Sequence, residues 1–255
     1  MGFHDHFSAQ SRQYAQYRPT YPQELAAFLA RAAPGRDVAW DVATGQGQAA
    51  RLLTAEFRRV LATDASGAQL ASAEPCERVE FRVAEAADSG LVDHCADLVT
   101  VAQAAHWFDL DTFYAEVRRT LRPQGVVAIW GYVLLQTHDA RIDRVVQDFQ
   151  DTGVGPYWPK GREILEAKYA TLPFPFEPVA APPFFMRVSW TRDDLLGYVG
   201  SWSAVARYRQ QHSEAGRSAR DSDPMPSFLD ELSRVWPREK VIDIEWPLYM
   251  RVGRV

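Results

Sequence analysis

The chain has 255 residues and a formal net charge of -5, with 47% hydrophobic and 24% charged residues. These values suit a globular domain with a substantial core, and the charge gives no overall attraction to nucleic acid or an anionic membrane. No apolar run approaches the roughly 20 residues of a membrane span. With two cysteines at no metal or redox spacing and no secretion-signal pattern, we expect a cytoplasmic protein without a metal site.

The first half of the chain predicts alternating strands and helices. A polar, tyrosine-rich arm (8–19) precedes a helix (21–33) that ends at Pro34-Gly35. The apolar runs that follow are continuous rather than alternating, which favours strands buried on both faces of a parallel sheet. We therefore expect an α/β fold. Its predicted strands are 38–43, 59–63, 79–84, 97–102 and 125–131, and its predicted helices are 48–57, 66–73 and 111–121.

The second half of the chain breaks this alternation. Helices are expected over 139–151 and 191–211, around a segment (156–186) rich in proline and phenylalanine. The end of the chain (241–254) predicts strands that close the sheet. Because no flexible linker separates the halves, we expect one domain. In this division, 1–34 is an N-terminal lid and first helix, 35–131 a cofactor-binding core, and 132–255 a substrate cap with the closing strands.

The most informative motif follows the first predicted strand. Asp41 ends an apolar run, Gly45-Gln46-Gly47 forms a turn, and a helix begins near Gln48. A tight glycine turn at a helix N-terminus places bare backbone N–H groups beside a ligand. The Asp41 carboxylate could accept hydrogen bonds from a cationic amine of that ligand. The motif therefore predicts a nucleotide-like cofactor.

Two cofactor classes use such a turn. Gly45-x-Gly47-x-x-Ala50, with Asp64 19 residues after Gly45, fits the dinucleotide fingerprint, so a nicotinamide-dependent oxidoreductase is one alternative. The acid before the glycines, Asp41, and the strand that ends in Asp64 instead resemble the first two motifs of class I S-adenosylmethionine-dependent methyltransferases. That resemblance implies that Asp64 holds the ribose hydroxyls, although Asp64 could also cap the helix near Ser66. The family usually has glycine where this chain has Ala43.

A second motif, Gln103-Ala104-Ala105-His106-Trp107-Phe108-Asp109, follows the fourth predicted strand. It is similar to the methyltransferase group that includes the trans-aconitate methyltransferases. Tyr14-x-x-Tyr17-Arg18-Pro19 and Gly197-Tyr198-x-x-x-Trp202-Ser203 resemble the same group, so the likeness covers nearly the whole chain. It implies a Rossmann-like, mostly parallel sheet with an antiparallel closing strand, helices on both faces, a C-terminal cap, and S-adenosyl-L-methionine as cofactor.

The same resemblance, together with the position of residues at predicted strand ends, indicates which residues contact the cofactor and the substrate. Arg18 could pair with a carboxylate of the cofactor or of an acidic substrate, or belong to an arm packed on the surface. His106 could orient or deprotonate the substrate, or be a structural hydrogen-bonding residue. The expected cofactor contacts are Asp41, Ala43, Gly45, Gly47, Asp64, Ala65, Glu85, Ala86, Gln103, Ala104, Tyr14 and Arg18, and the expected substrate contacts are Tyr17, Trp107, Trp158 and Trp202.

The expected reaction is in-line methyl transfer to a small molecule. We expect the protein to be a monomer or homodimer, and we expect no nucleic-acid or membrane partner. An oxygen, nitrogen or carbon of the acceptor would attack the methyl group. A carboxylate acceptor would need no general base, whereas a hydroxyl or protonated amine would make His106 the first base candidate. A non-catalytic module that only binds the cofactor is a further alternative.

Overall fold

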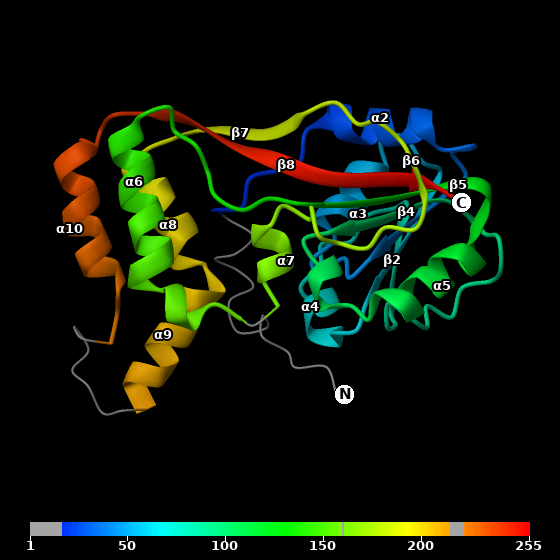
Figure 1. Ribbon diagram of the computed structural model, residues 1–255, viewed down its shortest axis with the longest axis horizontal. Coiled ribbons are helices and arrows are strands. Elements are labelled where there is room, and N and C mark those ends of the chain that lie inside the picture. The colour runs from blue at the N-terminus through cyan, green and yellow to red at the C-terminus, as the bar shows by residue number, and fades with distance from the viewer. Residues whose placement is uncertain (1–16, 160, 215–221) are drawn as a thin grey trace.

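The computed structural model describes residues 17–159, 161–214 and 222–255, and its centre is one mixed sheet (Figure 1). The strands lie in the order β3-β2-β1-β4-β5-β8-β6, and β7 pairs with β8 off this path. Their bounds are β1 Val38–Val42, β2 Arg59–Asp64, β3 Val79–Val83, β4 Ala96–Ala102, β5 Leu121–Gly131, β6 Glu177–Pro178, β7 Phe184–Trp190 and β8 Ile242–Arg254.

Strands β1 to β5 are parallel, and β8 closes the sheet in the antiparallel direction. This confirms the predicted α/β, Rossmann-like sheet and its antiparallel closing strand. Residues 241–254 were expected to form more than one strand, but they form the single long strand β8. Its second half pairs with β5 and β6, while its first half pairs with β7.

Two hydrophobic clusters lie on opposite faces of the sheet, because successive residues of a strand point to opposite sides. Along β5, Val126, Ala128 and Trp130 belong to one cluster, and Val127 and Ile129 to the other. Helices α2 and α3 contribute to the first cluster and α5 to the second. Among the described residues, no helix is both long and apolar enough to span a bilayer. The helices near the sheet are α2 Gln23–Ala32, α3 Gln48–Leu53, α4 Gly67–Ala71 and α5 Leu110–Thr120.

Helices α6, α8, α9 and α10 gather beyond one end of the sheet, and the β7–β8 ribbon extends from them to the sheet, whereas α7 lies close to the strands (Figure 1). The helix expected over 191–211 is in fact two helices. Ser201 and Trp202 interrupt it, and their backbone N–H groups bond to Tyr198 and Val199 in a tight turn. The elements of this region are α6 Ala140–Asp148, the short helices Phe149–Gly153 and Gly155–Tyr157, α7 Glu163–Glu166, α8 Arg192–Gly200, α9 Ser203–Glu214 and α10 Met225–Val235.

A buried carboxylate joins the first strand to its neighbour. Asp41 of β1 is fully buried and accepts hydrogen bonds from the hydroxyls of Thr100 on β4, at 2.7 Å, and of Thr44 in the following turn, at 2.5 Å. Burial raises the pKa of this carboxyl group from 3.8 to about 6, although the hydrogen bonds from Thr44, Thr100 and the backbone of Ala50 oppose the change. Asp41 therefore fixes the start of the glycine turn.

The substitution Asp41→Asn tests this assignment through the pH dependence of stability. Between pH values of about 4 and 6 the unfolded carboxyl group ionises while the folded one keeps its proton, so wild-type stability falls as the pH rises. The variant lacks this change. The difference in the free energy of unfolding, variant minus wild type, should therefore increase by about 3 kcal/mol as the pH rises from about 4 to 6. Urea unfolding at several pH values measures the difference, with the exposed Asp148→Asn as control, and parallel curves would contradict the assignment.

Candidate functional site: a cofactor turn beside a cavity

The glycine turn between β1 and α3 has a left-handed backbone, with φ angles of 58° at Gly45 and 81° at Gly47. A Cβ atom added to Gly47 would lie 2.7 Å from the ring of Phe81 on β3, so this glycine permits tight packing. A Cβ atom added to Gly45 would meet nothing within 4 Å. Gly45 therefore exposes its backbone to open space, which is what close approach of a ligand requires.

Asp64, at the end of β2, faces this turn. One carboxylate oxygen accepts a hydrogen bond from the Gly45 N–H at 2.8 Å, and the other accepts one from the Ser66 N–H at 2.8 Å. The helix cap that Asp64 might have supplied comes from Ser66, whose hydroxyl accepts from the Gln69 N–H. Asp64 thus lies beside the open face of the turn. The turn and Asp64 together fit S-adenosylmethionine.

Two further residues at strand ends have left-handed backbones, Ala43 after β1 (φ 51°) and Gln103 after β4 (φ 61°). Left-handed φ favours glycine, which accounts for the glycine that the methyltransferase pattern places at Ala43. The Gln103 side chain donates to the carbonyl of Tyr132 at 2.9 Å. Because β1 and β4 are neighbours, both residues lie at the carboxyl edge of the sheet.

The other nominated residues of the cofactor set are spread along this edge. Ala65 is half-buried directly after Asp64, and Ala104 is buried after Gln103. Glu85 and Ala86 follow β3, where Glu85 is exposed and Ala86 packs against the core. Tyr14 lies outside the described residues.

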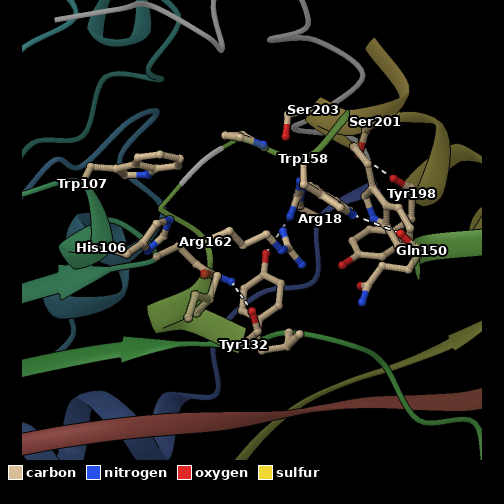
Figure 2. Close-up of a pocket in the computed structure, with 15 residues that line it drawn as sticks. Arg18, His106, Trp107, Tyr132, Gln150, Trp158, Arg162, Tyr198, Ser201 and Ser203 are labelled. Carbon is tan, nitrogen blue, oxygen red and sulfur yellow. Dashed lines mark hydrogen bonds between the residues drawn. The ribbon is translucent and has the colours of Figure 1, made fainter. Parts of the chain in front are cut away.

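A cavity of about 110 Å³ lies at the same edge (Figure 2). Three parts of the chain enclose it: the N-terminal segment, the ends of β4 and β5, and the cap. Its lining includes six of the residues that the sequence nominated or flagged, namely Arg18, Gln103, His106, Trp107, Trp158 and Trp202.

The N-terminal segment is held in place by contacts with the residue that follows β5 and with α8. Arg18 donates to the Tyr132 hydroxyl at 2.8 Å, and its guanidinium lies 5.3 Å from the ring centroid of Tyr198. Tyr17 packs against Gly197, where an added Cβ atom would lie 2.5 Å from the Tyr17 ring. The Gly197-Tyr198 motif therefore receives the segment that contains Tyr17 and Arg18.

His106 lies on the cavity wall as a mostly buried imidazole. Its Nδ1 atom is 3.2 Å from the Tyr169 hydroxyl, and its ring packs against Trp107. Burial, together with the positive charge of Arg162, lowers the pKa of His106 to about 4. The imidazole is therefore neutral at neutral pH, with one ring nitrogen engaged by Tyr169.

The three nominated tryptophans differ in their surroundings. Trp107 is 41% exposed at the cavity rim. Trp158 and Trp202 pack together with ring centroids 5.5 Å apart, and Trp202 is buried in the hydrophobic core. Trp202 thus anchors the cap as well as lining the cavity.

Several cavity residues with polar side chains were not predicted as site residues, namely Tyr132, Gln150, Arg162, Tyr198, Ser201 and Ser203. Tyr198 had appeared only as part of a motif. Arg162 lies in the proline-rich segment, where no periodic pattern marks it. Within the described residues, no group of three or more histidine, cysteine or acidic side chains is arranged to hold a metal ion.

Comparison with known proteins gives the family. A family model described as a methyltransferase domain matches residues 40–129. A predicted methyltransferase of Dictyostelium discoideum is 32% identical over 99% of this chain and 95% of its own length, and a predicted S-adenosylmethionine-dependent methyltransferase of Saccharomyces cerevisiae is 29% identical over 96% and 95%. The solved structure of a predicted type II methyltransferase from Anaeromyxobacter dehalogenans is 38% identical, with a TM-score of 0.84 over 93% of this chain and 98% of that one. The chain belongs to the class I S-adenosylmethionine-dependent methyltransferases.

Proposed function

We propose that this enzyme methylates a small molecule bound in the cavity of Figure 2, with a carboxylate oxygen as one candidate acceptor atom. The observation that carries the proposal is the pairing of an open Gly45 turn with a partly open cavity at the same sheet edge. A cavity of about 110 Å³ suits a small acceptor rather than a polymer. The proposed cofactor contacts are Asp41, Ala43, Gly45, Gly47, Asp64, Ala65, Glu85, Ala86, Gln103, Ala104, Tyr14 and Arg18, of which Asp41 also shapes the turn through Thr44 and Thr100.

The cofactor supplies a methyl group that its sulfonium charge already activates for displacement. The residues of the chain then have three tasks: binding, alignment and exclusion of water. The Asp64 carboxylate accepts a hydrogen bond from the Gly45 N–H at 2.8 Å and so holds the turn in place beside the proposed ribose position. Trp107, Trp158 and Trp202 supply aromatic surfaces on the cavity side. Arg18 closes the cavity from the N-terminal side, and Tyr17, the other proposed substrate contact, packs beside it against Gly197.

His106 serves this chemistry best as a neutral hydrogen-bonding group. A pKa of about 4 makes it a weak base, and Tyr169 fixes its ring. A carboxylate acceptor is already nucleophilic and needs no proton removed, so the neutral imidazole is compatible with methylation of an acid.

The proposal extends to the organisation of the chain as one domain, in which 1–34, 35–131 and 132–255 act as lid, core and cap. Its support is the large hydrophobic cluster, which contains residues of α2, β5, α8 and α10. We further propose that the enzyme is a monomer or homodimer and that it acts in the cytoplasm.

Titration with S-adenosylhomocysteine, the expected product, tests the cofactor site. The protein should bind it and should show no affinity for NADH. Asp64→Asn removes a charged acceptor and should weaken binding about 10- to 100-fold, because each hydrogen bond to a charged group contributes about 1.5–3 kcal/mol. Isothermal titration measures both constants, with Asp148→Asn as the exposed control. A wild-type protein that does not bind S-adenosylhomocysteine would overturn the proposal, and binding without turnover of any acceptor would favour a non-catalytic module.

The pH dependence of kcat/KM tests the role of His106. With a pKa lowered to about 4, the imidazole should contribute no inflection between pH values of about 6 and 9. His106→Gln should lower the rate without changing the shape of the profile in that range. An inflection near pH 6.5 that disappears in the variant would instead make His106 a general base.

A further inference from the structure

A second arginine, Arg162, enters the cavity from the cap. It directly precedes α7, and Figure 2 shows its side chain extending toward the space beside Tyr132 and Arg18. The side chain is only 16% exposed. A buried guanidinium normally has a carboxylate or a set of hydrogen-bond acceptors around it, because an unpaired buried charge is costly. The partners of Arg162 therefore indicate whether it serves the fold or a ligand.

Glu166 is the only hydrogen-bond partner of Arg162 within the part of the chain that the structure describes. It accepts from Nε at 3.1 Å, and its own side chain is 47% exposed. This contact leaves both terminal nitrogens of the guanidinium for another acceptor. Those nitrogens form one edge of the planar fork that binds a carboxylate in bidentate fashion.

The ring of Trp158 packs against this guanidinium group. The guanidinium carbon of Arg162 lies 3.8 Å from the ring centroid of Trp158, which is a close cation–π contact. The indole of Trp158 is itself fixed, because its N–H donates to the carbonyl of Gln150 at 3.2 Å and its ring packs on Trp202. The Arg162 side chain is therefore positioned before a ligand binds, so binding costs less conformational entropy.

The charge around the cavity also favours an anion. Arg18 and Arg162 both line it, and no acidic residue does so among the described lining residues. Burial lowers the pKa of Arg162, and the neighbouring charge of Arg18 lowers it further, although Glu166 opposes both effects. The two positive charges thus repel one another, and an anion bound between them would stabilise both.

We propose that Arg162 binds a carboxylate of the methyl acceptor, and therefore that the acceptor is a small organic acid. This assignment rests on the proposed function and gives it a substrate class. The anchored carboxylate is the poorer nucleophile of the acceptor, because bidentate pairing with a guanidinium occupies one lone pair of each oxygen and lowers the nucleophilicity of both oxygens. The acceptor consequently carries a second nucleophilic group, such as another carboxylate or a hydroxyl. Arg18 remains available to the cofactor or to the same acid.

The test compares variants in binding and in turnover. Protein saturated with S-adenosylhomocysteine is titrated with succinate, fumarate, benzoate and phthalate and with the corresponding neutral amides, and acids that are methylated are also assayed for KM. Arg162→Gln should weaken carboxylate binding about 10- to 100-fold. Arg162→Lys should recover little, because an ammonium ion lacks the planar fork. The matched control is Arg58→Gln, which removes the same charge from an 84% exposed side chain outside the cavity lining.

The outcomes separate this inference from the proposed function. If the wild-type protein does not bind S-adenosylhomocysteine, the function itself fails. If it binds S-adenosylhomocysteine but Arg162→Gln keeps its carboxylate affinity, or acids bind no better than their amides, only the role of Arg162 fails. Binding of inorganic phosphate in preference to every acid would also overturn the carboxylate assignment. Unchanged S-adenosylhomocysteine affinity and melting temperature in Arg162→Gln establish that the variant is folded.

Discussion

The hydrogen bonds of the buried Asp41 carboxylate are the constraint on which the site depends. They connect β1 to β4 through Thr100 and connect β1 to the glycine turn through Thr44. The position of the turn relative to both strands is therefore fixed from inside the protein. A carboxylate placed there is costly to ionise, as its raised pKa shows, but each of its two oxygens accepts a hydrogen bond from a threonine hydroxyl.

The fold could be predicted from the sequence because its signals are local. Continuous apolar runs indicate strands buried on both faces, and Gly45 and Gly47 mark a turn in which only residues that tolerate left-handed φ fit well. The cap was harder to predict. The break at Ser201 and Trp202 depends on the burial of Trp202 against Trp158 and Tyr198, which are tertiary contacts that helical periodicity does not contain.

The residues of the candidate site at the ends of the strands could be predicted from the sequence, whereas those in the cap were harder to predict. Gln103 and His106 could be predicted because they follow a long apolar strand, whereas Arg162 lies within a segment that has no regular pattern. The glycine spacing alone could not separate a dinucleotide from S-adenosylmethionine, since both cofactors use the same backbone turn. The resemblance of the acids Asp41 and Asp64 favoured the methyltransferase, and the family comparison excludes the oxidoreductase alternative. The narrower resemblance to trans-aconitate methyltransferases remains a prediction.

Strand β8 has a mechanical consequence. One half of it is bonded to β5 and the other half to β7, so a single backbone carries hydrogen bonds of both the sheet and the cap ribbon. A rotation of the cap away from the sheet would have to bend this strand or break one of its ladders. Loss of the last 14 residues, 242–255, would remove the partner of β5 and the partner of β7 together. The carboxyl-terminal strand thus restrains the cap relative to the sheet, because it is hydrogen-bonded to both.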